Sequence, residues 1–333
     1  MPYQPDPDLG AFIKSLPKTE THLHIEGALP FEFLQKINPV QFKEQPRSWA
    51  DDFKFQSFSE FEETLLAMAL QWFTSPERYY EAAVAIFHKH LEQNVKYVEI
   101  SFHAGIIEFL NIPGPEIIGA IRDAVPDGLE VRIFMGMLRN HYSQLMAPVI
   151  DDCVNWDSLD GIDLHGTEIL PLEDWAKSLW PRAREADKFT KVHAGEFRGA
   201  HYVKDAIEFL DVNRVEHGVR AIEDPEVLTM IIEKDITFDV CPISNLKLNV
   251  IDKMKNHPIR KLFNEGVRCT LNTDDPLSFG NQLEEEYAAL ALELNFSKKE
   301  LAILARNGFE IALMPESMKH PFIEQIDTII GSN

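Results

Sequence analysis

The sequence lacks an excess of positive charge and a long apolar run. Its 333 residues carry 32 Lys and Arg against 54 Asp and Glu, a formal net charge of -22. This balance argues against nucleic acid or an anionic membrane surface as a partner, and it is typical of a solvated, soluble surface. No stretch of 18 apolar residues is present, so the sequence predicts no membrane span.

Cysteine is also scarce. Cys153, Cys241 and Cys269 are odd in number and form no C-x-x-C pair, which indicates a reducing compartment. The first twenty residues contain four prolines and several charges without an apolar core. We therefore expect no signal peptide and a cytoplasmic protein. The tail from Gly331 onward is expected to fray.

Eight short, mostly apolar segments predict β-strands. They are rich in Val, Ile, Phe and Leu without regular polar alternation, which is typical of parallel strands buried on both faces. The expected strands are residues 21–27, 95–102, 129–138, 159–166, 190–196, 214–219, 236–245 and 267–276.

Helical patterns lie between these segments, at residues 77–94, 115–125, 171–186, 200–210, 224–233 and 257–265. The alternation predicts an α/β protein, a (β/α)8 TIM barrel formed by residues 1–333 as a single domain. A doubly wound open sheet is the alternative, but no glycine-rich phosphate or dinucleotide loop supports it.

The interval between the first two strands, about residues 28–94, is longer than one crossover helix requires. It is helical and rich in aromatic residues, so we expect a helical insertion after the first strand. Two interpretations stay open. The insertion caps the barrel and buries its own core, or it acts as a lid that excludes water from an active site.

Histidines and a carboxylate stand at the ends of predicted strands. His22 and His24 are two residues apart on a strand, so both imidazoles point to one face. His193 lies at the end of the fifth strand and Asp274 at the end of the eighth, which is adjacent to the first in a closed barrel. These groups can converge at the C-terminal mouth, where active sites of this fold lie. Three imidazoles and one carboxylate suit Zn²⁺ with a position left for water.

Further candidates for catalysis lie beside these ligands. Glu196 follows His193 by three residues and is a candidate acid/base, while His217 ends the sixth strand and is a candidate to hold an attacking water. Asp274 and Asp275 are neighbours and point in different directions, so one can serve a metal and the other a substrate. The fourth strand, residues 159–166, lacks the lysine that bridges two metals in many barrel hydrolases, which indicates a single metal ion.

Taken together, these motifs resemble the adenosine deaminase family. The resemblance covers about residues 12–315. It is carried by PKTETHLHIEGA at 17–28, VHAGE at 192–196, RVEHG at 214–218, CPISN at 241–245 and LNTDDP at 271–276.

The resemblance implies a purine aminohydrolase that acts at C6 of a 6-aminopurine with one Zn²⁺ per chain. It implies the metal ligands His22, His24, His193 and Asp274, and the catalytic residues Glu196, His217 and Asp274. Glu196 would protonate the ring at N1, His217 would orient the attacking water, and Asp274 would align its proton. The implied substrate-binding residues are His24, Glu26, Gly166 and Asp275, with Asp275 at N7 and the backbone of Gly166 at N3.

Some positions depart from the pattern of adenosine enzymes. Many adenosine enzymes carry an aspartate at the position of Glu26, where it contacts the ribose. They also tend to carry an arginine at the position of His103. We expect adenosine deamination to inosine and ammonia, with adenine to hypoxanthine, or a modified adenosine analogue, as the alternative. Deamination of another amino-heterocycle and a non-enzymatic binding protein stay as further alternatives. Zinc or iron in the cell and the oligomeric state are left open.

Overall fold

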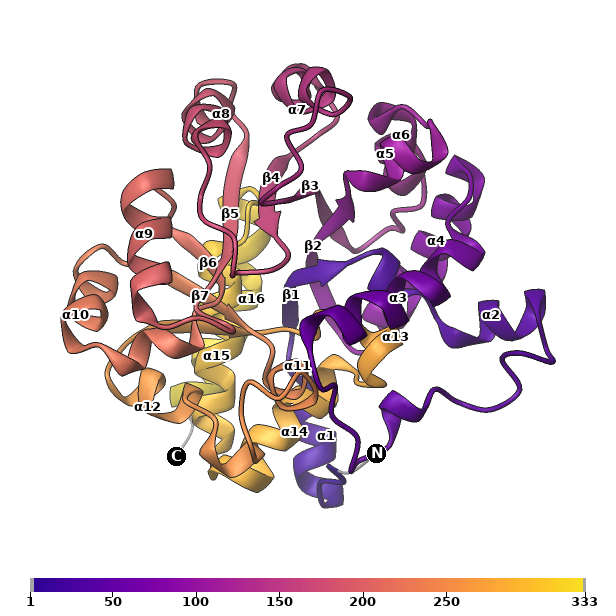
Figure 1. Ribbon diagram of the computed structural model, residues 1–333. Helices are drawn as coiled ribbons and strands as arrows, with labels where there is room; N and C mark the ends of the chain where they lie inside the picture. Colours follow the sequence, from indigo (N-terminus) through magenta and orange to yellow (C-terminus); the bar gives the residue numbers. More distant parts are fainter. Residues whose placement is uncertain (1–2, 332–333) are drawn as a thin grey trace.

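The computed structural model describes residues 3–331 and shows parallel strands that form a barrel ringed by helices (Figure 1). The eight strands of the described sheet pair in chain order, and a parallel bridge between Leu23 and Asp274 joins the last strand's end to the first. The predicted TIM barrel is confirmed. The strands are β1 (Lys18–His24), β2 (Val95–His103), β3 (Glu130–Leu138), β4 (Gly161–His165), β5 (Phe189–Ala194), β6 (Arg214–His217), β7 (Thr237–Val240) and β8 (Arg268–Leu271).

The predicted seventh and eighth strands are too long at their C-terminal ends. β7 ends at Val240, before the short helix α11 (Pro242–Lys247), and β8 ends at Leu271, before α13 (Pro276–Phe279). Each of these helices has a proline in its first turn, where the missing N–H is not required. The segments that follow β7 and β8 therefore turn over the barrel mouth instead of extending the strands.

Helices alternate with the strands around the barrel. The predicted helix at residues 200–210 is confirmed at both ends, and the others differ by a few residues. The crossover and terminal helices are α1 (Pro7–Ser15), α4 (Pro76–Glu92), α5 (Gly105–Leu110), α6 (Gly114–Asp123), α7 (Ala147–Asp152), α8 (Asp174–Glu185), α9 (Ala200–Leu210), α10 (Pro225–Glu233), α12 (Ile259–Asn264), α14 (Leu283–Leu294), α15 (Lys298–Ile311) and α16 (Glu316–Gly331).

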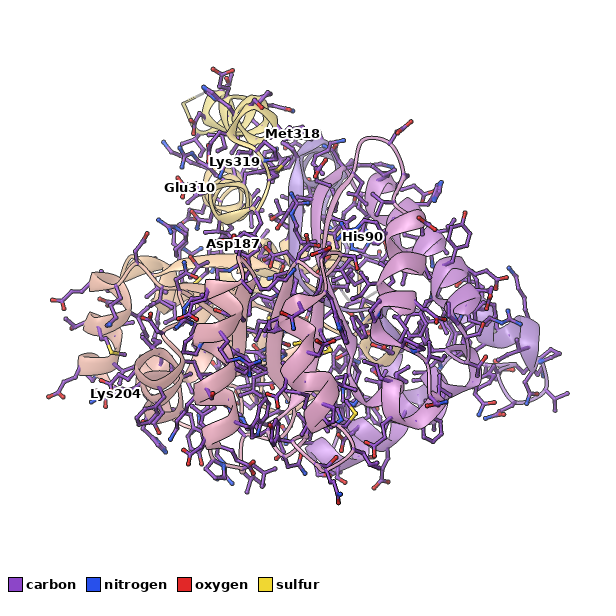
Figure 2. All side chains as sticks on the ribbon, turned by 90° about the horizontal axis from the view of Figure 1, so that it is seen from above. His90, Asp187, Lys204, Glu310, Met318 and Lys319 are labelled. Carbon is purple, nitrogen blue, oxygen red and sulfur yellow. The ribbon has the colours of Figure 1, made fainter. Side chains whose placement is uncertain are left out.

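The two last helices, α15 and α16, pack against one another beside the barrel (Figure 2). Lys319 of α16 donates to the backbone oxygen of Glu310 in α15 at 3.4 Å. Within residues 3–331, no helix combines the length and the apolar character needed to cross a bilayer. The part of the tail beyond Gly331 that was expected to fray lies outside the described residues.

The long interval after β1 contains α2 (Phe31–Ile37) and α3 (Phe58–Trp72) in addition to α4. α4 is the regular helix of the first β/α unit, so the extra chain ends before it. α3 packs on the barrel mouth through an aromatic cluster, in which Phe61 stacks on Phe279 of α13 with ring centroids 5.4 Å apart. The insertion therefore buries its own apolar side chains against the mouth of the barrel.

Candidate active site

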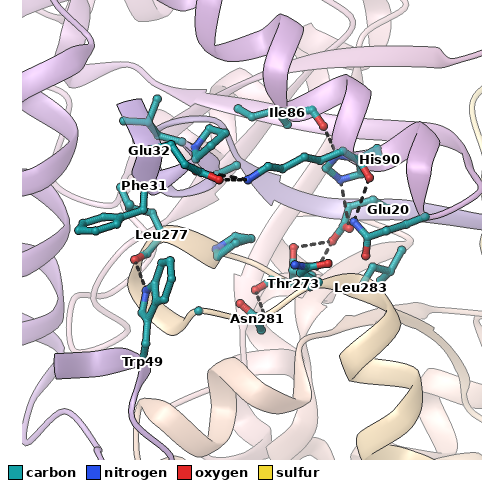
Figure 3. Close-up of a pocket in the computed structure, with 18 of the residues that line it drawn as sticks. Glu20, Phe31, Glu32, Trp49, Ile86, His90, Thr273, Leu277, Asn281 and Leu283 are labelled. Atoms are coloured by element: carbon teal, nitrogen blue, oxygen red, sulfur yellow. Dashed lines mark hydrogen bonds and ion pairs between the residues drawn. The ribbon is translucent and has the colours of Figure 1, made fainter. Parts of the chain in front are cut away.

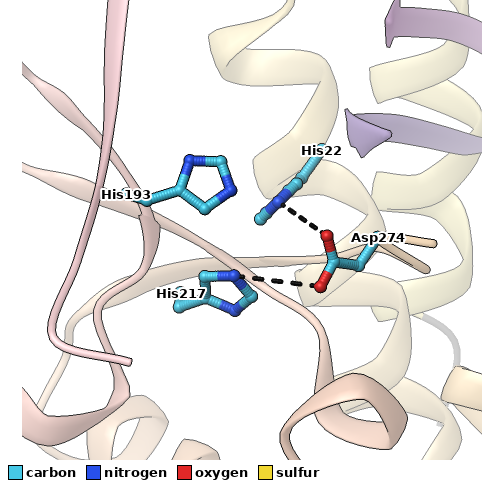
Figure 4. A group of neighbouring side chains, drawn as sticks. All are labelled: His22, His193, His217 and Asp274. Carbon is cyan, nitrogen blue, oxygen red and sulfur yellow. Dashed lines mark ion pairs between the residues drawn. The ribbon is translucent and has the colours of Figure 1, made fainter. Parts of the chain in front are cut away.

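Histidine and aspartate side chains meet at the C-terminal mouth of the barrel. One group contains His22, His193, His217 and Asp274, with candidate ligand atoms that all lie within 4.8 Å of one another (Figure 4). A second group contains His24, Asp274 and Asp275. Asp274 belongs to both groups, so the structure brings together all four residues that the sequence predicted as metal ligands.

The orientation of His22 leaves a lone pair in the centre of this cluster. Its Nδ1 lies 3.2 Å from the backbone oxygen of Asp239. Because a carbonyl oxygen only accepts, Nδ1 carries the proton and Nε2 is unprotonated in the neutral ring. This Nε2 is buried, has no hydrogen-bond partner among residues 3–331, and faces Asp274 Oδ1 at 3.3 Å. Two acceptors facing each other in a buried site fit a cation between them.

His193 and His24 follow a related pattern. His193 Nδ1 lies 2.9 Å from Glu216 Oε2 and 3.2 Å from Asp163 Oδ1. His24 Nδ1 lies 2.9 Å from the Ser101 hydroxyl, and its Nε2 lies 3.3 Å from Asp274 Oδ1. A partner on Nδ1 orients the ring and leaves Nε2 for a metal, which is the usual support of a metal-binding histidine. The cluster is therefore suited to a metal ion.

His217 is held in the opposite way. The backbone N–H of Ile259 donates to His257 Nδ1 at 3.0 Å, so His257 carries its proton on Nε2 and donates to Asn245 Oδ1 at 3.1 Å. The Asn245 amide then donates to His217 Nδ1 at 3.2 Å. His217 consequently carries its proton on Nε2, which lies 3.5 Å from Glu196 Oε2. A protonated nitrogen cannot bind a metal, so this geometry fits a hydrogen-bond donor.

Two residues of the cluster adopt backbone conformations that favour glycine. His217 has φ of 66° and Asp274 has φ of 68°. Such conformations cost on the order of 1–3 kcal/mol and are concentrated at functional sites. Asp274 is held there by β1, because its N–H donates to the oxygen of His22 at 3.3 Å and its oxygen accepts from the N–H of His24 at 3.2 Å. The Ser244 hydroxyl donates to Asp274 Oδ2 at 2.6 Å and orients the carboxylate.

The three carboxyl groups at the site differ in their tendency to ionise. Burial, together with the charge of Asp274, raises the pKa of Glu196 and the pKa of Asp275 well above their ordinary values. Burial opposes ionisation of Asp274 too, but positive charge in the cluster holds the pKa of Asp274 well below its ordinary value. Without a metal ion this charge comes from the protonated form of His22, with hydrogen bonds from His22 and His24. Asp274 is therefore the carboxyl group of the three that ionises most readily, and Glu196 and Asp275 hold their protons more tightly.

Glu168 positions the loop that carries Glu196. Its buried carboxylate accepts four consecutive backbone N–H groups at 2.5–3.0 Å. The donors are Gly195, Glu196, Phe197 and Arg198. No role is predicted from the sequence for Glu168, Asn245 or His257, because nothing in their local sequence indicates these partners.

A cavity of about 110 Å³ opens beside the cluster, and the predicted substrate residues His24, Glu26, Gly166 and Asp275 line it. Phe58, Phe61 and Leu65 of α3 cover it. Gly166 has φ of 84°, and a Cβ there would lie 2.6 Å from the Leu138 side chain. Gly27 allows a close approach of Asp275, because a Cβ at Gly27 would lie 1.7 Å from Asp275 Oδ1.

Glu26 forms a fixed wall of this cavity. Its carboxylate accepts the Tyr79 hydroxyl at 2.7 Å and the backbone N–H of His103 at 3.2 Å. Burial raises the pKa of Glu26 to about 7, although both hydrogen bonds oppose the shift. The side chain of His103 in turn lies 3.1 Å from the ring of His165, so the wall continues as a row of imidazoles.

An eight-stranded parallel barrel with this cluster at its mouth defines an amidohydrolase with a site suited to a metal ion. A family model for adenosine deaminase matches residues 17–329. The chain belongs to the adenosine deaminase family, as the sequence motifs indicated, and is a purine aminohydrolase.

Individual relatives agree with this assignment. An adenine deaminase of Acinetobacter baylyi is 30% identical over 328 residues, which cover 95% of this chain and 98% of that protein. The crystal structure of an adenine deaminase from Arthrobacter aurescens has a TM-score of 0.84 at 23% identity and covers 95% of this chain and 100% of that chain. An amidohydrolase from Burkholderia ambifaria, solved with bound Zn, has a TM-score of 0.80 at 23% identity and covers 99% of this chain and 96% of that chain. The two solved structures establish the fold.

Replacing Glu216 by glutamine should weaken metal retention. The substitution removes the charged acceptor that lies 2.9 Å from His193 Nδ1. Loss of such a supporting partner typically lowers metal affinity about 10- to 100-fold. Metal content after dialysis against graded chelator measures this directly, and Glu208→Gln on the exposed face of α9 is the matched control. Equal metal retention by both variants would contradict the role of Glu216.

The pH dependence of stability should report the buried His257. Burial lowers the pKa of His257 to about 3, whereas an unfolded histidine titrates near 6.5. Below about pH 6 the unfolded chain binds a proton that the folded chain does not, so His257 contributes a loss of stability as the pH falls. Above pH 7 His257 does not change the dependence of the unfolding free energy on pH.

His257→Gln should reduce the slope of unfolding free energy against pH by about 1.4 kcal/mol per pH unit between about pH 6 and 4. Urea unfolding at a series of pH values gives the slope. The exposed His320→Gln is the control and should keep the slope of the unmodified protein. A His257→Gln slope that matches this control would show that His257 takes up its proton in the folded state.

Proposed function

We propose that the protein hydrolyses adenine to hypoxanthine and ammonia, with one Zn²⁺ held by His22, His24, His193 and Asp274. The observation that carries the choice of adenine is the wall formed by Glu26, which Tyr79 and His103 fix at the edge of the cavity. The curated relative from Acinetobacter baylyi is named adenine deaminase, which favours this alternative over the adenosine reaction expected first. The zinc in the Burkholderia ambifaria structure supports the choice of metal.

His22, His24, His193 and Asp274 would hold the zinc ion, which would activate a water molecule as the nucleophile near neutral pH. The protein residues then distribute the protons. Glu196, which burial keeps protonated, donates to N1 of the ring and makes C6 more electrophilic. The ionised Asp274 accepts the proton of the attacking water, and the Nε2–H of His217 donates to the oxygen on which negative charge develops. The C6–O bond forms, the C6–N bond breaks, and the amino group leaves as ammonia after gaining a proton.

The remaining polar groups match the edges of adenine. N7 of the ring is an acceptor, and Asp275 retains a proton that it can donate. Its Oδ1 has no hydrogen-bond partner within the described residues, so the group is available for this contact. The backbone N–H of Gly166 donates a hydrogen bond to N3, and the carboxylate of Glu26 accepts one from N9–H. His24 lines the same cavity. A nucleoside has no hydrogen on N9, so it leaves Glu26 without that partner.

We also propose that the insertion, including α3, is a lid over this cavity. Phe58, Phe61 and Leu65 place apolar surface above the cluster, which excludes water from the reacting groups. The packing of Phe61 on Phe279 anchors the same helix to the barrel. The helix α3 therefore both buries an apolar core against the barrel and closes the site.

Glu196→Gln should retain the metal and bind adenine but lose about 100- to 10,000-fold in kcat, because glutamine cannot exchange the proton. Steady-state turnover with the metal content of the same sample tests this. Near-normal kcat would contradict the acid/base role. Loss of metal would indicate that Glu196 instead holds the cluster together.

The protein should prefer adenine over adenosine by at least about 100-fold in kcat/KM, because a nucleoside cannot donate an N9–H to Glu26 and its ribose would have to fit against a carboxylate that Tyr79 and His103 hold in place. Glu26→Ala should reduce adenine turnover and narrow this preference. Ultraviolet assays of both substrates measure the ratio, with Glu63→Ala on the exposed side of α3 as the control. A preference of the unmodified protein for adenosine would refute the proposed substrate but leave the C6 chemistry intact.

A further inference from the structure

The helix α3 carries one charged side chain on the face that lines the substrate cavity. Its lining residues recur at helical spacing, at positions 58, 61, 62, 65, 66, 69 and 70, and all of them are apolar except Glu62. Apolar side chains at these positions suit a helix that covers a cavity, so packing does not account for the carboxyl group. Glu62 is only half-buried, and a ligand that enters the cavity can therefore reach it.

No cation neutralises Glu62. Within residues 3–331 its carboxylate forms neither an ion pair nor a hydrogen bond. The helix contains Glu60, Glu62 and Glu63 but no Lys or Arg. The other two carboxylates have partners, since Glu60 accepts the N–H of Gln56 at 2.6 Å and Glu63 accepts the Ser59 hydroxyl at 3.3 Å. Glu62 is therefore the uncompensated negative charge that α3 presents to the cavity.

The other side chains around the cavity supply no basic partner. The acidic residues Glu26 and Asp275 line it, whereas no Lys or Arg among the described residues does. Glu62 also belongs to neither cluster of candidate metal ligands. A second cavity, of about 290 Å³, differs in this respect (Figure 3), because Glu32 on its wall is paired with Lys89 at 3.3 Å. The substrate cavity therefore offers an anionic ligand no permanent side-chain cation.

The charge on Glu62 has a predictable effect on ligands that carry phosphate. A phosphate group has about 1.5 to 2 negative charges at pH 7. At a separation of about 10 Å and an intermediate effective dielectric constant, repulsion by one carboxylate weakens its binding on the order of 10-fold. An uncharged purine does not experience this repulsion. Glu62 therefore separates ligands by their charge, whereas the wall formed by Glu26 separates them by the presence of a sugar.

We propose that Glu62 is a specificity-determining residue, which rejects nucleoside phosphates by charge repulsion and admits uncharged purines. This role rests on the proposed purine cavity, but it does not depend on whether adenine or adenosine is the better substrate. Burial and the neighbouring Glu63 raise the pKa of Glu62. The test is therefore made at pH 8, well above the ordinary range of a carboxyl group.

Steady-state deamination of adenosine and of adenosine 5′-phosphate by the full-length, zinc-loaded protein tests this role. At low ionic strength the unmodified protein should favour adenosine at least about 10-fold in kcat/KM. Glu62→Gln removes the charge, keeps the shape and should narrow this ratio about 5- to 10-fold, and the reversed charge of Glu62→Lys should narrow it further. Glu63→Gln removes the same charge on the exposed side of α3 and is the matched control, which should keep the ratio within about 2-fold.

Salt provides the second measurement. Sodium chloride at about 0.5 M shortens the screening length to about 4 Å, so the ratio of the unmodified protein should approach that of Glu62→Gln. An unchanged ratio in both Glu62 variants would overturn the proposal. Absence of turnover of the phosphate by every variant would also overturn it, because the shape of the cavity would then exclude the phosphate.

The control decides whether the effect belongs to Glu62. Equal narrowing by Glu62→Gln and Glu63→Gln would overturn the proposal, because the total charge of α3 would then be responsible. A preference for adenosine over adenine would refute the proposed substrate without affecting the ratio of adenosine to its phosphate.

Discussion

The placement of protons on buried histidines is the constraint on which the site depends. The partners that orient His22, His24 and His193 come from different strands: the backbone of Asp239 on β7, Ser101 on β2 and Asp163 on β4. A shift of one residue in any of these strands would turn its side chains to the other face. The barrel must therefore close for the histidine Nε2 atoms and Asp274 to meet in one group of side chains. The same barrel directs the Nε2 proton of His217 toward Glu196.

A single ionised carboxylate organises the chemistry around this cluster. Positive charge in the cluster keeps Asp274 charged, and its charge then raises the pKa values of Glu196 and Asp275, which burial has already raised. One buried environment thus contains a base and two proton donors. Enzymes assign acid and base roles near neutral pH by giving neighbouring carboxyl groups different environments and therefore different pKa values.

The sequence predicted those parts of the structure that local pattern determines. Apolar runs located all eight strands, and the spacing of His22 and His24 placed two ligands on one face. The prediction failed beyond β7 and β8, where residues 241–245 and 272–276 were assigned to the strands. These segments are partly polar, and Pro242 and Pro276 each begin a short helix. The prediction also failed for Glu168 and for the His257–Asn245–His217 chain, because their partners are supplied by distant segments that the fold alone brings together. The roles assigned to the site residues stay predictions that depend on this geometry.

In the proposed reaction, the choice of adenine over adenosine depends on a contact between the barrel and a helix outside it. Glu26 follows β1, yet Tyr79 of α4 and the backbone of His103 hold its carboxylate in place. Size alone is a weak basis for discrimination, since an apolar pocket rejects a modestly larger group by only about 1–3 kcal/mol. A buried carboxyl group that loses its hydrogen-bond donor is penalised more strongly. Under this proposal the residues on the strands perform the same ring chemistry on either substrate, and Glu26, a single fixed side chain at the edge of the cavity, selects adenine.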